Sequence, residues 1–129
     1  MYTCKGSDSE NTQETIALAM KRAKELELKT LVVASHSGKT AQLCLGYDLE
    51  IICVTHHIGF AGPGIDEMEK GVRQNLQSQG VKVLTTTHLF AGIDRALRLQ
   101  AGGLYPGEIV AQALRLFGQG VKVGIECSV

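Results

Sequence analysis

Apolar positions along the chain alternate between helical spacing and short continuous runs. Ile16, Met20, Ala23 and Leu26 recur at helical spacing, which predicts a helix over residues 10–28 with one apolar stripe. A continuous apolar run with two β-branched valines then predicts a strand at 31–34 that is buried on both faces, as in parallel sheets. The alternation continues, with further strands expected at 51–55, 81–86 and 121–127. Helices are expected at 39–45, from Ile65 to a cap at Gly80, at 93–100, and from Pro106 to Phe117. In the last helix we expect the core-facing positions Ile109, Ala113 and Leu116 or Phe117.

Strands separated by helices predict an α/β fold: a three-layer α/β/α domain with a mostly parallel sheet, over residues 1–129. We expect the strand order 3-2-1-4, with strand 31–34 in the interior. In such sheets ligands bind outside the carboxyl ends of the strands, where the order reverses. The last expected strand, 121–127, has no following segment to cover it, so we expect an exposed sheet edge that a second subunit or a missing tail covers.

Composition excludes several classes of partner. Thirteen basic residues balance thirteen acidic ones among 129, so no basic surface for nucleic acid or anionic membranes is expected. No apolar run is long enough for a membrane-spanning helix, and residues 1–6 lack the apolar core of a signal peptide, so we expect a cytoplasmic protein. The four cysteines are Cys4, Cys44, Cys53 and Cys127, and they are widely spaced without a C-x-x-C pair. This spacing favours reduced thiols, and we expect Cys53 and Cys127 to pack as small hydrophobic residues.

The segment 35–41 joins the first expected strand to a helix, and its chemistry suits an anion. Backbone N–H groups at a helix start are unpaired, and the helix dipole there favours negative charge. Ser37 and Thr40 add hydroxyl groups, Lys39 adds a positive charge, and Gly38 lets the backbone approach a ligand closely. The alternative is an ordinary capped turn, but position and chemistry together favour phosphate binding.

Other glycine and serine motifs give weaker signals. The segment is not a Walker A loop, which needs a glycine where Val33 stands, so hydrolysis of a nucleoside triphosphate is not supported. Residues 59–64 do not match the dinucleotide fingerprint and indicate either a loop that closes over a ligand or a plain connection. There is no G-x-S-x-G elbow, Glu126 alone indicates no reaction, and Arg115 and Lys122 are expected on a solvated face.

Four histidines follow the first three expected strands: His36, His56, His57 and His88. Carboxyl ends of parallel strands share one edge, so these rings can meet there. Three imidazoles suit a transition metal, but no H-x-H or H-x-x-x-H spacing supports one, and we assign no metal site. One histidine acting as a general base is the other possibility.

The residues around Ser37-Gly38-Lys39-Thr40-Ala41 carry a resemblance. Residues 17–55 resemble the opening of the C-terminal α/β domain of pyruvate kinase, with a helix, an apolar strand, S-G-R/K-S/T-A, a helix and a second strand. Nearly the whole chain resembles a family of stand-alone proteins named after that domain, through Asn11-Thr12, Thr87-His88 and, most specifically, residues 114–123. Such relatives continue past the last expected strand, whereas this sequence ends at Val129, as a fragment or a short member.

The resemblance implies binding rather than pyruvate kinase activity, because that active site lies in a barrel domain absent from this sequence. In pyruvate kinase the S-G-R/K-S/T loop binds the phosphate of a sugar-phosphate effector. We therefore expect a phosphorylated small molecule, a sugar phosphate or flavin mononucleotide; a small enzyme using His36, His56 or His88 as acid or base is the alternative. A structural or assembly domain is a third interpretation, since the relative forms subunit contacts, and a homo-oligomer is expected. The resemblance and the expected sheet edge together give the candidate ligand residues Asn11, Thr12, Ser35, His36, Ser37, Gly38, Lys39, Thr40, His56, Thr87, His88 and Glu126.

Overall fold

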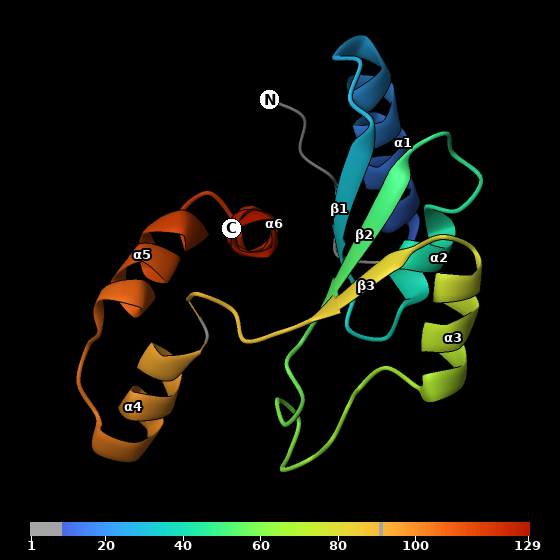
Figure 1. Cartoon of the computed structure of the whole chain (residues 1–129). Coiled ribbons are helices and arrows are strands. Elements are labelled where there is room, and N and C mark those ends of the chain that lie inside the picture. Colours follow the sequence, from blue (N-terminus) through green and yellow to red (C-terminus); the bar gives the residue numbers. More distant parts are fainter. Residues whose placement is uncertain (1–8, 91) are drawn as a thin grey trace.

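A computed structural model describes residues 9–90 and 92–129. Helices and strands alternate over the first part of the chain, and three helices follow the last strand (Figure 1). The elements are α1 Ser9–Glu25, β1 Thr30–Ala34, α2 Lys39–Leu43, β2 Glu50–Thr55, α3 Lys70–Ser78, β3 Lys82–Thr85, α4 Ile93–Ala101, α5 Pro106–Arg115 and α6 Gln119–Ser128.

The sheet is parallel, as the buried strand runs predict. Its order is β1-β2-β3, with Val33 opposite Cys53 and Val54 opposite Leu84. The α/β class and the relative order of the first three strands are therefore confirmed. Within the described residues β1 lies at one edge of the sheet, so its expected interior position is wrong.

The segment 121–127, expected to be a fourth strand, lies inside helix α6. The last position in the order 3-2-1-4 is therefore wrong, and so is the strand edge expected there. Val121, Val123 and Ile125 alternate with a period of two, which favoured a strand. Lys122 and Glu126 are four residues apart, however, so in a helix they share one face and can pair. Helix α6 packs beside β1 instead of extending the sheet (Figure 1).

One face of the sheet carries the core. Side chains at alternate strand positions, including Val33, Ile51 and Cys53, pack against helices α1, α2 and α3. The expected stripe on α1 is confirmed for Ile16, Met20 and Ala23, which are buried, while Leu26 lies past the helix end and is exposed. Figure 1 shows these three helices on one side of the sheet.

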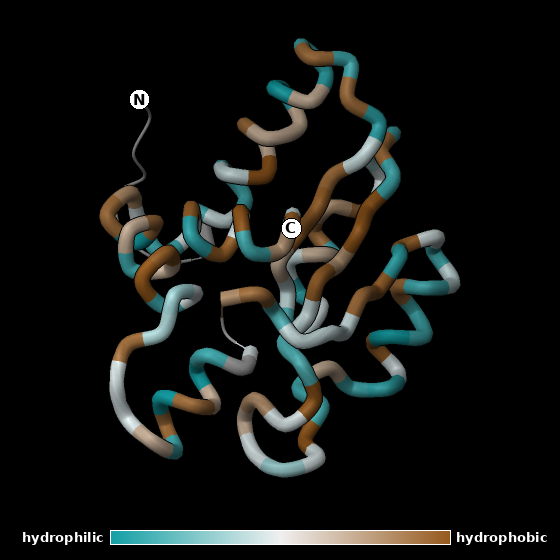
Figure 2. The backbone as a smooth tube through the Cα atoms, turned by 60° about the vertical axis from the view of Figure 1, so that its left-hand side comes forward, coloured by the Kyte–Doolittle hydropathy of each residue, from teal (hydrophilic) through white to brown (hydrophobic). Residues whose placement is uncertain are grey.

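The opposite face of the sheet is only partly covered. Val54 is buried there, but the exposed fractions of Val32 and Leu84 are 38% and 48%. Burial of β1 on both faces was therefore a wrong expectation, because α4, α5 and α6 stand on this side without closing over it (Figures 1 and 2). The positions in and just after α5 that were expected in the core are also exposed; these are Ile109, Ala113, Leu116 and Phe117.

Two helix starts illustrate local control of the fold. Pro106 is at the first position of α5, as predicted. Helix α3 begins at Lys70, later than Ile65 and Met68 suggested, because the Asp66 carboxylate accepts a hydrogen bond from the Met68 amide (3.0 Å) and forms a local turn.

In the described part of the chain no helix combines the length and apolarity needed to cross a membrane. Cys4 lies outside the described residues.

Candidate functional site

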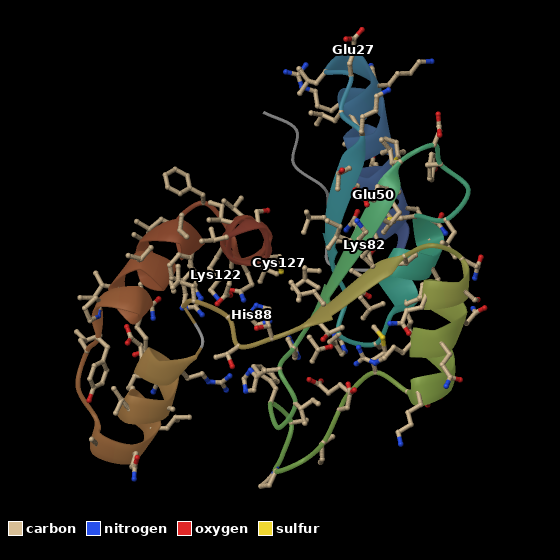
Figure 3. All side chains as sticks on the ribbon, viewed as in Figure 1. Glu27, Glu50, Lys82, His88, Lys122 and Cys127 are labelled. Carbon is tan, nitrogen blue, oxygen red and sulfur yellow. The ribbon has the colours of Figure 1, made fainter. Side chains whose placement is uncertain are left out.

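A cavity of about 800 Å³ opens at the carboxyl ends of the three strands, between the sheet and helices α4–α6. Its volume is within the range of small-molecule sites. The sheet side contributes residues at or just after the ends of β1, β2 and β3, among them Ser35, His36, Thr55, His56 and His88. The helix side contributes mostly charged and polar residues; Figure 3 labels Lys122 and Cys127 of α6 and, across from them, His88.

Aromatic rings form a stack along one wall of the cavity. The His36 and His56 ring centroids are 5.2 Å apart with nearly parallel planes, and His56 also stacks on Phe60 at 3.9 Å. The guanidinium carbon of Arg95 lies 4.6 Å from the Phe60 ring centroid, a cation–π distance. The glycine-rich loop therefore contributes Phe60 to the cavity, and Phe60 joins the histidines to a positive charge.

Hydrogen bonds orient two of the histidine rings. The Nδ1–H group of His56 donates to the Glu67 carboxylate at 2.6 Å, which leaves Nε2 as the acceptor nitrogen of the neutral ring. His88 is oriented the opposite way, because its Nε2–H group donates to the Thr55 carbonyl at 2.7 Å. His57 does not line the cavity, and its buried Nδ1 has no hydrogen-bond partner within the described chain.

A polar network fixes the loop that follows β2. Arg73 of α3 donates to Asp66 at 2.7 Å and to the Thr85 hydroxyl at 2.9 Å. That hydroxyl is 2.7 Å from the hydroxyl of Thr55, at the end of the neighbouring strand. These bonds tie the far end of loop 56–69 to the strand ends, and so support the position of Glu67 beside its histidine.

Charges along the cavity are unequal. Four cationic side chains line it against two acidic ones, so the cavity carries two excess positive charges when its histidines are neutral; the cations are Arg95, Arg98, Arg115 and Lys122, and the acids are Glu108 and Glu126. Arg98 donates to Glu108 at 2.6 Å, joining α4 to α5. The guanidinium of Arg95 has no acceptor within hydrogen-bond distance among residues 9–90 and 92–129, so it is available to an anion.

Helix α6 places a buried ion pair against the cavity. Lys122 is 5% exposed and its ammonium donates to Glu126 Oε2, while Glu126 Oε1 has no partner within the described chain. The expectation of a solvated face is therefore wrong for Lys122, and Arg115 also lines the cavity. The strand assignment caused this error, because it hid the i, i+4 relation between Lys122 and Glu126.

The segment after β1 contributes less to the cavity than expected. Ser35 and His36 line it, whereas residues 37–40 do not. The Ser35 hydroxyl accepts a hydrogen bond from the Thr40 amide at 3.2 Å, which closes the turn from within. A phosphate-binding role for residues 37–40 stays a prediction.

Gly38 has a packing role that the sequence did not reveal. It is buried, its φ is +85°, and a Cβ atom there would lie 2.7 Å from Cγ1 of Val72 and 3.1 Å from Cδ1 of Leu76. The missing side chain makes room for α3, so the contact that explains this glycine is with the core.

The other candidate ligand residues are divided between the cavity and the rest of the molecule. Ser35, His36, His56, His88 and Glu126 come together at the cavity. Asn11 and Thr12 lie in the first turn of α1 and Thr87 lies in the loop after β3; none of the three lines the cavity.

Burial raises the pKa values of the cysteine thiols for which a shift is seen. The pKa of Cys53, in the core, is raised to about 11 by loss of solvation. Burial also raises the pKa of Cys127, which lines the cavity, and the nearby Glu126 carboxylate adds to the effect.

Within the described residues no three His, Cys, Asp or Glu side chains are arranged to hold a metal ion.

Sequence reasoning missed the arginines of the cavity. Arg95 and Arg98 are three residues apart on α4, a spacing that puts two side chains on one helix face. That spacing was a usable signal, but nothing local showed that this face turns toward the strand ends. Phe60 and Glu67 were missed because their roles depend on how loop 56–69 folds back.

The fold is a parallel α/β domain with a cavity at the carboxyl edge of its sheet, the edge where ligands bind in such folds. The family model of the pyruvate kinase alpha/beta domain matches residues 13–125. The match covers most of the 129 residues, so the chain belongs to this family.

Proposed function

We propose that the cavity at the strand ends binds a phosphorylated small molecule, a sugar phosphate or flavin mononucleotide, without pyruvate kinase activity. The observation that carries the proposal is the excess of positive charge in a cavity of about 800 Å³. Anions are favoured where arginine side chains line a partly desolvated cavity, because charge-assisted hydrogen bonds to phosphate are strong there.

Arg95 is the side chain best placed to hold the phosphate. Its guanidinium lies over Phe60, and no described carboxylate neutralises it. Arg98 is already paired with Glu108, so it offers less to an anion. Ser35 and His36, which also line the cavity, supply further polar groups, and both are among the ligand residues that the sequence suggested.

The test is calorimetric titration of the full chain with inorganic phosphate, fructose 1,6-bisphosphate, glucose 6-phosphate and flavin mononucleotide. We expect inorganic phosphate to bind weakly and at least one phosphorylated compound to bind better. Arg95→Met should weaken binding of that compound by roughly 10- to 100-fold, the range for losing one charge-assisted bond.

Arg22→Met is the matched control, because it removes the same charge from α1, where Arg22 pairs with Glu25 away from the cavity. This control should bind as the wild type does. If no phosphorylated compound binds the wild type, or if both variants bind equally well, the proposal is wrong.

A second candidate function is acid–base catalysis on such a ligand by His56. The specific observation is its 2.6 Å hydrogen bond to Glu67, which fixes the tautomer and leaves Nε2 as a base at the cavity wall. A base of this kind removes a proton next to a carbonyl group of a sugar phosphate.

Proton NMR in D2O measures that reaction directly. With fructose 6-phosphate or dihydroxyacetone phosphate, the wild type should exchange the carbon-bound hydrogen next to the carbonyl group for deuterium, and His56→Gln should not. Glu67→Gln should shift the pH profile of the exchange, since Glu67 is a positioning residue. Exchange by the His56 variant at the wild-type rate rejects catalysis by this residue.

A further inference from the structure

The Lys122–Glu126 pair on α6 leaves one carboxylate oxygen without a hydrogen-bond partner at the cavity wall, among the described residues. Both side chains are 6% exposed, and both residues line the cavity. Lys122 donates to Oε2 of Glu126, while the buried Oε1 has no hydrogen-bond partner among the described residues. A buried carboxylate oxygen without a donor is costly, and buried polar groups in folded proteins are almost always hydrogen-bonded.

No donor of the described cavity residues reaches this oxygen. The Nε–H group of Arg115 donates to Gln119 at 3.0 Å, and that of Arg98 donates to Glu108 at 2.6 Å. A molecule that enters the cavity can supply the donor that Glu126 Oε1 lacks. An ionised carboxylate only accepts hydrogen bonds, so the molecule must present a hydroxyl or N–H group at this point.

We propose that Glu126 accepts a hydrogen bond from a hydroxyl group of the bound phosphate ester, which makes the site selective for hydroxylated phosphate esters over alkyl ones. The inference rests on the proposed function and names the part of the ligand that α6 recognises. The pair also sets the ligand's direction. Glu126 repels a phosphate and neutralises the charge of Lys122, so the phosphate lies toward Arg95 and the hydroxyl groups lie toward α6.

Two six-carbon phosphate monoesters test this selectivity. Sorbitol 6-phosphate carries hydroxyl groups along its chain, and n-hexyl phosphate carries none. Calorimetric titration of the wild-type chain with both should give tighter binding of sorbitol 6-phosphate. The double variant Lys122→Met/Glu126→Met should lower the ratio of the two affinities by roughly 10- to 100-fold, the effect of losing one hydrogen bond to a charged group.

The double variant removes one positive and one negative charge, so the net charge of the cavity is conserved. Replacing a buried ion pair with apolar side chains of similar length is often neutral for stability, and circular dichroism checks the fold. If the double variant does not fold, the wild-type titrations still decide, because equal affinity for the two esters contradicts the inference.

The possible failures are distinguishable. If both esters bind, and the double variant has the same ratio of affinities as the wild type, the role of Glu126 is wrong while the proposed function stands. If the wild type binds neither of the two esters and none of the phosphorylated compounds named above, both the proposed function and the role of Glu126 are wrong.

Discussion

The two faces of the sheet are built on different chemistry. On the face covered by α1, α2 and α3 the fully buried side chains are apolar, with Met68, Leu76 and Cys53 among them. On the face toward α4–α6 the buried residues of α6 are Lys122 and Glu126, and the large apolar side chains Ile109 and Val110 of α5 are exposed. Apolar burial stabilises a fold, whereas a buried ion pair contributes little net stability. The first face therefore holds the domain together, and the second carries the candidate site.

The strand residues show the same division. Val33 faces the core and is buried, while its neighbour Val32 faces the other side and is 38% exposed. Figure 2 shows the strands as mainly hydrophobic segments, so composition alone does not separate the two faces. What separates them is the packing of helices, which is tight on one side and open on the other.

The largest expected effect comes from crowding the packed side at Gly38. Gly38→Ala forces a side chain into a left-handed backbone conformation, at about 1–2 kcal/mol, and presses its Cβ against Val72 of α3, at about 1–3 kcal/mol more. We expect the free energy of unfolding to fall by roughly 2–5 kcal/mol in total. Urea denaturation monitored by circular dichroism measures it.

Two other glycines serve as controls for this substitution. Gly46 has a similar φ of +87°, and a Cβ atom there would have no described neighbour within 4 Å, so Gly46→Ala should cost only the backbone contribution, about 1–2 kcal/mol. Gly124 lies within α6 on the open side, and Gly124→Ala should stabilise by about 0.5–1 kcal/mol through helix propensity. Equal losses at Gly38 and Gly46 would show that packing against α3 contributes nothing.

The packed side of the molecule was largely predictable from the sequence. Helical spacing at Ile16, Met20 and Ala23, and continuous apolar runs at β1 and β2, depend on local periodicity that burial in a core enforces. The family resemblance was also visible in local motifs, and the match over residues 13–125 confirms it.

The open side was not predictable in the same way. The pattern at residues 121–127 fits a strand by its apolar alternation and a helix by its Lys122–Glu126 spacing, and only tertiary packing decides between them. The histidines could be placed at the strand ends because strand ends are local features. The arginines of α4 and α5 could not, since their position depends on how those helices fold back over the sheet.

The last prediction compares two thiols, one on each side of the sheet. Burial raises the pKa of Cys53, in the core, to about 11 from an ordinary value of 9.0. Below pH 9 the thiol is protonated in both states and has no effect on stability. Between about pH 9 and 11 the unfolded chain loses this proton and the folded chain keeps it, so the free energy of unfolding falls by about 2–3 kcal/mol.

Urea denaturation of the wild type and of Cys53→Ala at about pH 8 and about pH 11 isolates this contribution, because other groups titrate equally in both proteins. The free energy of unfolding should fall less between these two pH values in Cys53→Ala than in the wild type, by about 2–3 kcal/mol. Cys127→Ala, on the side of the cavity, should reduce the loss less, since Cys127 is only partly buried and the positive charge of Lys122 opposes the rise in its pKa. If Cys127→Ala removes more of the loss than Cys53→Ala, then desolvation is stronger at the cavity than in the core, and the contrast between the two faces is wrong.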